Sequence, residues 1–312
     1  MKKLLIGILV LLVFLTGSVY FFIPENITVA AEIVTGSSTG TVQRITGNSH
    51  YRLKWLPGGG ETIPPSSYML DGCTYQFSTD NSLINHIGIR YKNIQANSLL
   101  TLLPSGDTVL VNWLFSRQSS HNPVSRISDY FALRHIKQTN QKILGAMQAF
   151  LSSKKNVYGF EVNRENQTDS TLITIKATVS HYPTVTEIYF NIEKLKQYAA
   201  VNDAKATNAP MLNITAADAG NWSFMVALPI NKALNNKGDI MAKRMFAGGK
   251  ILITEPITGG FAVIDNALEN LDKFRMDYNY LSPAIPFQSL ITDRPAEPDS
   301  LKWKTKLYFP VY

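Results

Sequence analysis

The sequence of 312 residues has little of the chemistry that metal sites need, with one cysteine and five histidines. A single cysteine, Cys73, excludes a disulfide framework and any cysteine-rich zinc or iron–sulfur site. No two histidines stand four residues apart, and none belongs to an HExxH pattern. They are His50, His86, His121, His135 and His181. We therefore expect no metal site and no metal cofactor.

Motifs for nucleophilic catalysis and nucleotide binding are also missing. The sequence has no GxSxG turn, no GxxxxGK loop and no GxGxxG fingerprint. Cys73 lies in a strand-like run, where a buried and inert thiol is the expected state. We therefore assign no catalytic residue and no organic cofactor, and we expect binding rather than catalysis.

Charge is sparse, because only 17% of the residues are charged and the formal net charge is +7. Apart from Lys2 and Lys3, the positive excess is spread over residues 25–155 rather than gathered in a dense basic stripe, so no nucleic-acid partner is expected. A hydrophobic fraction of 45% excludes an intrinsically disordered chain. The chain length of 312 residues is consistent with about two folded domains.

One long apolar run is present, at residues 4–23, and it contains no charged side chain. As a helix it would span about 30 Å, the thickness of the hydrocarbon core of a bilayer. Lys2 and Lys3 precede it, which predicts a single-pass anchor over 1–24 with the rest of the chain extracytoplasmic. The alternative is a signal peptide cleaved after Val29-Ala30-Ala31.

Residues 25–155 have the pattern of an antiparallel sheet that grips a helix. Strand-like runs are expected at 27–34, 66–77, 82–91, 97–103 and 107–116. A long helix follows, with Ile136, Ile143, Met147 and Phe150 on one face. Residues 51–65, which include Gly58-Gly59-Gly60, are expected to form a loop.

Residues 156–312 contain an internal repeat of strand, helix, strand and strand. The first copy is expected at 170–180, 184–202, 210–216 and 221–229, and the second at 249–257, 260–279, 285–292 and 302–310. Each helix has one apolar stripe that can lie on a sheet. The sequence therefore predicts an α+β domain with pseudo-two-fold symmetry and a cleft between its halves.

The second block resembles the GyrI-like family of small-molecule (effector) binding domains of bacterial regulators. The resemblance covers about residues 157–312 and rests on GGK at 248–250, PFQS at 286–289, TDR at 292–294 and TKLYFPV at 305–311. No helix-turn-helix segment precedes this block, so direct control of transcription is not expected.

The first block resembles the SRPBCC (START-like, polyketide-cyclase-like) superfamily. The residues that carry this resemblance are Ile23-Pro24, Ile27-Thr28-Val29, the Trp55-Leu56-Pro57-Gly58 segment and the long last helix. Both resemblances imply folds that form cavities, but a fold alone does not name a ligand.

The GyrI-like resemblance implies a set of ligand-binding residues, which are Phe261, Phe287, Gln288, Lys306 and Tyr308. Gln288 stands where relatives often carry a glutamate, and Lys306 where the last strand often carries another. A cation would lack its counter-ion in such a cleft, so we expect a neutral or anionic ligand. The alternative is that both residues are solvated strand positions.

These observations lead to one expected function and two alternatives. The expected protein is a membrane-tethered binder of a small organic molecule in the GyrI-like cleft. The first alternative is a hydrolase or cyclase that uses the SRPBCC-like cavity, which would need converging titratable side chains. The second is a structural or partner-binding extracytoplasmic module, which would expose an apolar patch.

Overall fold

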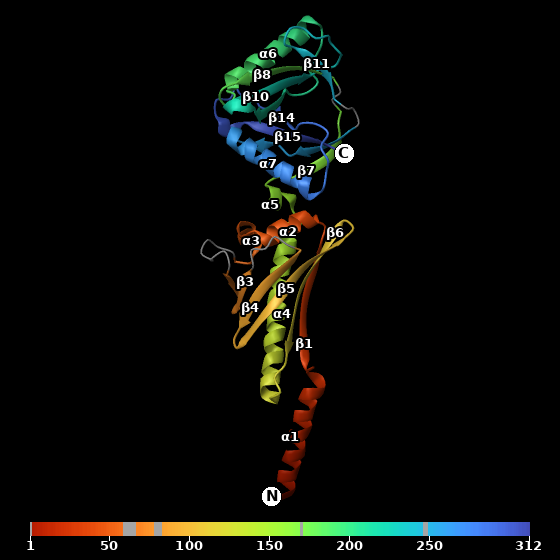
Figure 1. Ribbon diagram of the computed structural model, residues 1–312, viewed down its shortest axis with the longest axis vertical. Helices are drawn as coiled ribbons and strands as arrows, with labels where there is room; N and C mark the ends of the chain where they lie inside the picture. The colour runs from red at the N-terminus through yellow and green to blue at the C-terminus, as the bar shows by residue number, and fades with distance from the viewer. Residues whose placement is uncertain (1, 59–66, 78–82, 169–170, 246–248) are drawn as a thin grey trace. The chain divides into compact units, whose positions relative to one another are not determined.

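The computed structural model describes residues 2–58, 67–77, 83–168, 171–245 and 249–312. Gly59, Gly60 and Gly248, which the sequence analysis singled out, lie outside these residues. The chain divides into two compact units, unit 1 at Met1–Ser153 and unit 2 at Lys154–Tyr312 (Figure 1).

The N-terminal helix α1 (Lys2–Phe22) corrects one expectation, because the transmembrane helix over 1–24 is wrong. Among the residues that the structure describes, no helix is long and apolar enough to cross a membrane. Thr16 and Ser18 interrupt the apolar run, and their hydroxyls donate to the carbonyls of Leu12 and Leu15.

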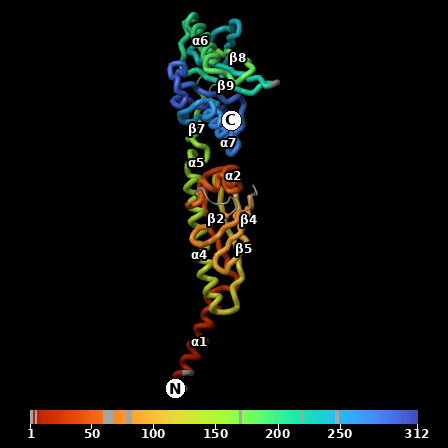
Figure 2. The backbone as a smooth tube through the Cα atoms, turned by 90° about the vertical axis from the view of Figure 1, so that its left-hand side faces the viewer, coloured from red at the N-terminus to blue at the C-terminus, as the bar shows by residue number. Residues whose placement is uncertain are grey.

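The remainder of unit 1 is an antiparallel sheet with one long helix against it. The sheet has the order β1-β6-β5-β4-β3-β2. Its strands are β1 (Asn26–Thr35), β2 (Ser67–Leu70), β3 (Cys73–Phe77), β4 (Ile84–Tyr91), β5 (Ile94–Ser105) and β6 (Thr108–Gln118). The helix α4 (Pro123–Leu151) runs beside these strands in Figure 2 and buries Ile136, Ile143 and Met147.

Two short helices, α2 (Thr39–Gly47) and α3 (Ser49–Trp55), connect β1 to the rest of the sheet. The expected loop at 51–65 is therefore wrong in its first part. The Asn48 side chain accepts a hydrogen bond from the backbone N–H of His50 and so caps the start of α3. This capping signal was not used in the prediction from the sequence. Trp55 ends this helix and donates its indole N–H to the carbonyl of Ile45.

Unit 2 contains the tandem arrangement of strand, helix, strand and strand. The first copy is β8 (Thr171–Val179), α6 (Val185–Val201), β9 (Met211–Ala216) and β10 (Trp222–Pro229). The second is β12 (Lys250–Thr254), α7 (Phe261–Asp277), β14 (Phe287–Leu290) and β15 (Lys304–Val311). In each copy the last strand lies between the other two, and pairing of β9 with β14 joins the copies into one sheet.

Strands that the sequence analysis did not expect complete the sheet of unit 2. Its order is β11-β8-β10-β9-β14-β15-β12-β7, with β13 (Ile257–Thr258) paired to β15. The edge strand β7 (Val162–Asn166), which follows the short helix α5 (Lys154–Tyr158), pairs with β12. The other edge strand, β11 (Met241–Arg244), pairs with β8. β7 thus precedes the first copy in the chain but pairs with a strand of the second copy. β11 precedes the second copy but pairs with a strand of the first.

The two faces of this sheet differ because side chains alternate along each strand. Residues such as Ile173, Leu212 and Phe224 face α6 and form one core with its apolar stripe. The second helix covers the same face, where the guanidinium of Arg275 lies 5.4 Å from the ring of Phe309. We call this the helix-covered face. The opposite face carries a second apolar cluster, which includes Leu172, Met211, Ala227, Ile251 and Phe287.

Candidate functional site

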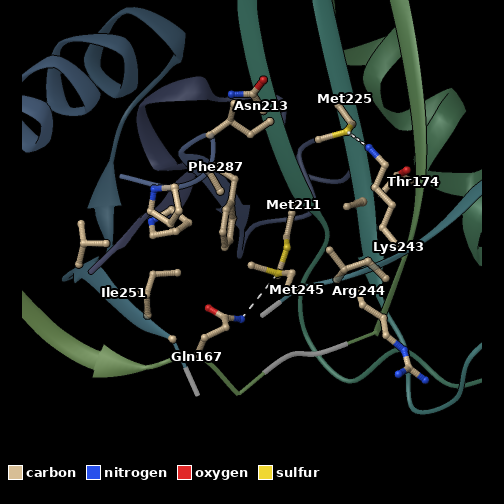
Figure 3. A pocket seen from close by; sticks show the side chains of 18 of the residues that line it. Gln167, Thr174, Met211, Asn213, Met225, Lys243, Arg244, Met245, Ile251 and Phe287 are labelled. Carbon is tan, nitrogen blue, oxygen red and sulfur yellow. Dashed lines mark hydrogen bonds between the residues drawn. The ribbon is translucent and has the colours of Figure 1, made fainter. Parts of the chain in front are cut away.

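The face of the sheet opposite the helices carries a pocket of about 460 Å³, which we call the methionine pocket (Figure 3). Both copies of the repeat contribute to it, so it lies between the halves of unit 2. Its lining includes Gln167, Leu172, Thr174, Met211, Asn213, Met225, Ala227, Lys243, Arg244, Met245, Lys250, Ile251, Pro283, Ile285, Phe287, Pro310 and Tyr312. This volume lies within the range of small-molecule sites.

Apolar side chains form most of the walls of the methionine pocket. Met211, Met225 and Met245 project into it from three segments, and Phe287 lies opposite them in Figure 3. Phe287 is itself held by Tyr308 of the neighbouring strand, because their rings are nearly parallel with centroids 4.9 Å apart. Methionine side chains are flexible and polarizable, so such walls adapt to ligands of irregular shape.

Few polar side chains line the methionine pocket, and several of them donate to sulfur or to the backbone. Lys243 donates to the sulfur of Met225 at 3.5 Å, and Gln167 donates to the sulfur of Met245 at 3.7 Å. The amide of Asn213 donates to the carbonyl of Pro286. Among the described residues that line this pocket, the ionisable side chains are cationic apart from Tyr312, and none is a carboxylic acid.

A second hollow, of about 550 Å³, lies on the helix-covered face, and we call it the acidic cleft. Asp265, Glu269 and Asp272 line it from α7, and Tyr182, Trp222 and Phe309 line it from other elements. The hydroxyl of Tyr182 donates to the Asp265 carboxylate at 3.0 Å. Burial raises the pKa of Asp265 and that of Tyr182 above their usual values. The acidic cleft thus differs in charge from the methionine pocket.

Beside the acidic cleft, aromatic rings stack edge to face in a row. Ring centroids lie 4.9 Å apart for Tyr182 and Trp222, 5.2 Å for Tyr182 and Phe261, and 5.6 Å for Phe261 and Trp303. The guanidinium of Arg294 lies 4.9 Å from the ring of Phe261 and 4.7 Å from that of Trp303. Burial lowers the pKa of Arg294. Through these contacts the partly buried Phe261 packs against the core of unit 2.

The structure separates the five residues that the sequence analysis proposed as a site. Phe287 and Tyr308 share the face of the methionine pocket, and only Phe287 lines it. Lys306 lies on that face too, because it is opposite Ser289 in the pairing of β14 with β15, but it does not line the pocket. Phe261 lies on the helix-covered face.

Gln288 lies on the helix-covered face, since it pairs with Leu307 and Leu212 in the sheet. It is only 2% exposed, and its Oε1 has no hydrogen-bond partner among the described residues. The premise that Gln288 and Lys306 share one cleft is therefore not met. Successive residues along a strand point to opposite faces of the sheet. Gln288 lies opposite Leu307, so Lys306, the residue before Leu307, points to the other face.

Most of the residues that line the methionine pocket were not predicted from the sequence. Met211, Met225 and Ala227 were predicted to lie on strands but were not predicted to face a ligand. Lys243 and Gln167 lie on or next to the edge strands β11 and β7, which were not expected. The only signal in the sequence was the alternation along 210–216 and 221–229, which separates two faces without showing where either face forms a pocket.

The space between the sheet and α4 in unit 1 is occupied by the protein's own side chains. Trp113, Tyr68 and Tyr75 are its largest fully buried residues, and the ring of Tyr75 contacts both others. Tyr75 donates its hydroxyl to Oδ1 of Asn140, which comes from α4. Cys73 is buried beside them, as expected, and burial raises the pKa of its thiol. A thiol in this state is a poor nucleophile.

No group of three or more histidine, cysteine, aspartate and glutamate side chains that could hold a metal occurs among the residues that the structure describes. The chemistry that the described residues offer is therefore that of an apolar pocket with cations at its rim and an acidic cleft on the opposite face.

No protein-family model matches this sequence, and no curated protein matches it. Solved structures do resemble the chain. One is the C-terminal domain of EcmrR, with 17% identity over 49% of this chain and 98% of that one and a TM-score of 0.42. Another is EcmrR in a complex with DNA, with 16% identity over 60% of this chain and 70% of that one and a TM-score of 0.43. A third is the di-domain ARO/CYC protein BexL, with 7% identity over 92% of this chain and 85% of that one and a TM-score of 0.31.

Proposed function

We propose that unit 2 binds a small organic molecule in the methionine pocket, and that this ligand is neutral or anionic rather than cationic. In this proposal unit 2 is a GyrI-like effector-binding domain and unit 1 is an SRPBCC-like domain. The strand, helix, strand, strand repeat of unit 2 and the sheet-and-helix architecture of unit 1 support these assignments.

The observation that carries the proposal is an apolar pocket between the two copies of the repeat, whose described lining contains no acidic side chain. Burial of apolar ligand surface contributes roughly 25 cal/mol per Å² and is the main source of affinity in such a pocket. Lys243 and Lys250 lie at this pocket and favour negative over positive charge in the ligand. The acidic cleft has the opposite preference, but it lies on the other face of the sheet.

Filling the methionine pocket tests the proposal. Ala227 lines the pocket and is buried, so Ala227→Phe would place an aromatic ring inside it. The matched control is Thr178→Phe, on an exposed position that faces the same side of the sheet outside the pocket. We expect the full chain to enhance the fluorescence of the anionic dye anilinonaphthalenesulfonate, and Ala227→Phe to reduce this binding at least tenfold.

Thr178→Phe should bind the dye as the unmodified protein does. Thermal unfolding of both variants shows whether they are folded. Equal dye binding by a folded Ala227→Phe variant would contradict the proposal, because the dye would then bind elsewhere.

The alternative of a hydrolase or cyclase in unit 1 has less support. Trp113, Tyr68 and Tyr75 fill the interior that would have to hold a substrate. The titratable side chains among them, Tyr68 and Tyr75, and the neighbouring Cys73 have pKa values raised by burial, so they stay protonated at neutral pH. None of the three is prepared to act as a base or a nucleophile.

A further inference from the structure

Lys243 has an unusual environment at the rim of the methionine pocket. It lies on the edge strand β11 opposite Leu172, which directs its side chain to the face that carries the pocket. Figure 3 shows its ammonium group turned toward the neighbouring Met225, and the Nζ to Sδ distance is 3.5 Å. Lys243 makes no second hydrogen bond and no ion pair with any other residue that the structure describes.

A thioether sulfur is a weak acceptor, whereas a lysine ammonium group has three donors. A carboxylate, sulfonate or phosphate oxygen at this position would make charge-assisted hydrogen bonds, which are about twice as strong as those between neutral groups. The present partner of Lys243 is therefore one that an anionic group of a ligand could replace without breaking an existing ion pair.

The other cations at the pocket are placed differently. The ammonium group of Lys250 already donates to Oδ1 of Asn166 at 2.6 Å. The guanidinium of Arg244 points away from the centre of the pocket in Figure 3. Lys243 is therefore the cation best placed to contact a group that lies between Met225 and Met211.

We propose that the ligand of the methionine pocket is an amphipathic monoanion, with its acidic group bound to Lys243 and its apolar body against Met211, Ile251 and Phe287. This inference rests on the proposed function, since it specifies the ligand class of the same pocket. It goes further in preferring an anion over a neutral molecule and in assigning the charge recognition to one side chain.

The test compares three probes that share one ring system and differ in charge, namely naphthylacetate, naphthylethanol and naphthylethylamine. Each is titrated calorimetrically into the full chain at pH 7 and low salt. We expect naphthylacetate to bind about tenfold more tightly than naphthylethanol, and naphthylethylamine to bind most weakly. Added salt should reduce the advantage of the anion, because the rim is solvated.

Two variants assign the preference to Lys243. Lys243→Met removes the charge while keeping an apolar side chain, and it should make naphthylacetate and naphthylethanol bind equally. Lys243→Arg should keep most of the preference, because it keeps the cation. The control is Lys232→Met, which removes the same charge from an exposed lysine outside the pocket lining and should leave the preference unchanged.

The outcomes separate this inference from the proposed function. Equal binding of the anion and the alcohol by the unmodified protein, or an equal loss of preference in Lys232→Met, would overturn the role of Lys243 while the pocket remained a binding site. Binding of the probes that survives Ala227→Phe would overturn the proposed function itself. Absence of binding by all three probes would count against both.

Discussion

Gln288 and Lys306 point to opposite faces of the sheet of unit 2, although they lie on adjacent paired strands. Leu307 is the residue opposite Gln288, and Ser289 is the residue opposite Lys306. Gln288 is therefore part of the packed interior beneath the helices, and a charge placed there meets the protein core rather than a ligand. This relationship determines how substitutions at Gln288 act.

We expect Gln288→Glu to destabilise unit 2 by about 2–4 kcal/mol at pH 7, because a carboxylate would be buried without a counter-ion. Burial would raise the folded-state pKa of this carboxyl, so the loss should be small below its unfolded pKa near 4.3 and should grow as the pH rises. Denaturant unfolding at pH 4 and pH 7 measures the loss of stability and its dependence on pH. Gln288→Met is the control and should be nearly neutral, since Oε1 has no described partner to lose. Unchanged stability of Gln288→Glu at pH 7 would show that a cation, such as the buried Arg294, pairs with the new carboxylate.

Asp265 gives a pH-dependent prediction in the unmodified protein. Its pKa is raised in the folded state, first by burial and also by the nearby Glu269. A carboxyl with a raised folded pKa contributes most to stability below its unfolded pKa, near 3.9, and this contribution is lost as the pH rises through the folded pKa. Asp265→Asn should therefore gain stability relative to the unmodified protein as the pH rises from about 3.5 to 7. Parallel denaturant titrations at these pH values check it, and a relative stability that falls with pH would contradict it.

In unit 1, Tyr75→Phe should cost about 1–3 kcal/mol of stability. The substitution removes the hydroxyl that donates to Asn140 and leaves a fully buried amide oxygen without this partner. Urea unfolding measures the effect. Tyr91→Phe is a suitable control, because the ring of Tyr91 stacks on His135 at a less buried position and needs no hydroxyl to do so. An equally small effect of both substitutions would show that water or another group satisfies Asn140.

We expect residues 154–312 to fold without unit 1. Unit 2 has its own core under α6 and a second apolar cluster on the opposite face of its sheet. Expression of this segment alone should give a soluble protein with cooperative thermal unfolding, and it should bind anilinonaphthalenesulfonate as the full chain does. An insoluble or unfolded product, with residues 25–312 soluble, would indicate that the two blocks depend on a shared interface.

Periodicity in the sequence was sufficient to predict the main elements of both units. The repeated spacing of Val185, Ile188, Ile192 and Leu195 on one helix and of Phe261, Ile264, Leu268 and Leu271 on the other predicted α6 and α7. Local patterns can do this because the period of the side chains directly reflects the geometry of the backbone. The prediction of a membrane-spanning helix at α1 was wrong, because it rested on the apolar composition of residues 4–23 and gave no weight to the polar residues Thr16 and Ser18.

The candidate site depended on relations between distant residues, which local patterns do not contain. Only the pairing of β11 with β8 brings Lys243 to Met225, and only the pairing of β14 with β15 sends Gln288 and Lys306 to opposite faces. A shift of register by one residue would exchange these faces, so the register is a property of the assembled sheet. The sequence by itself determined the repeat and its strands and helices through their periodicity, whereas the folded sheet decided which side chains line the hollow on each face and which charges meet there.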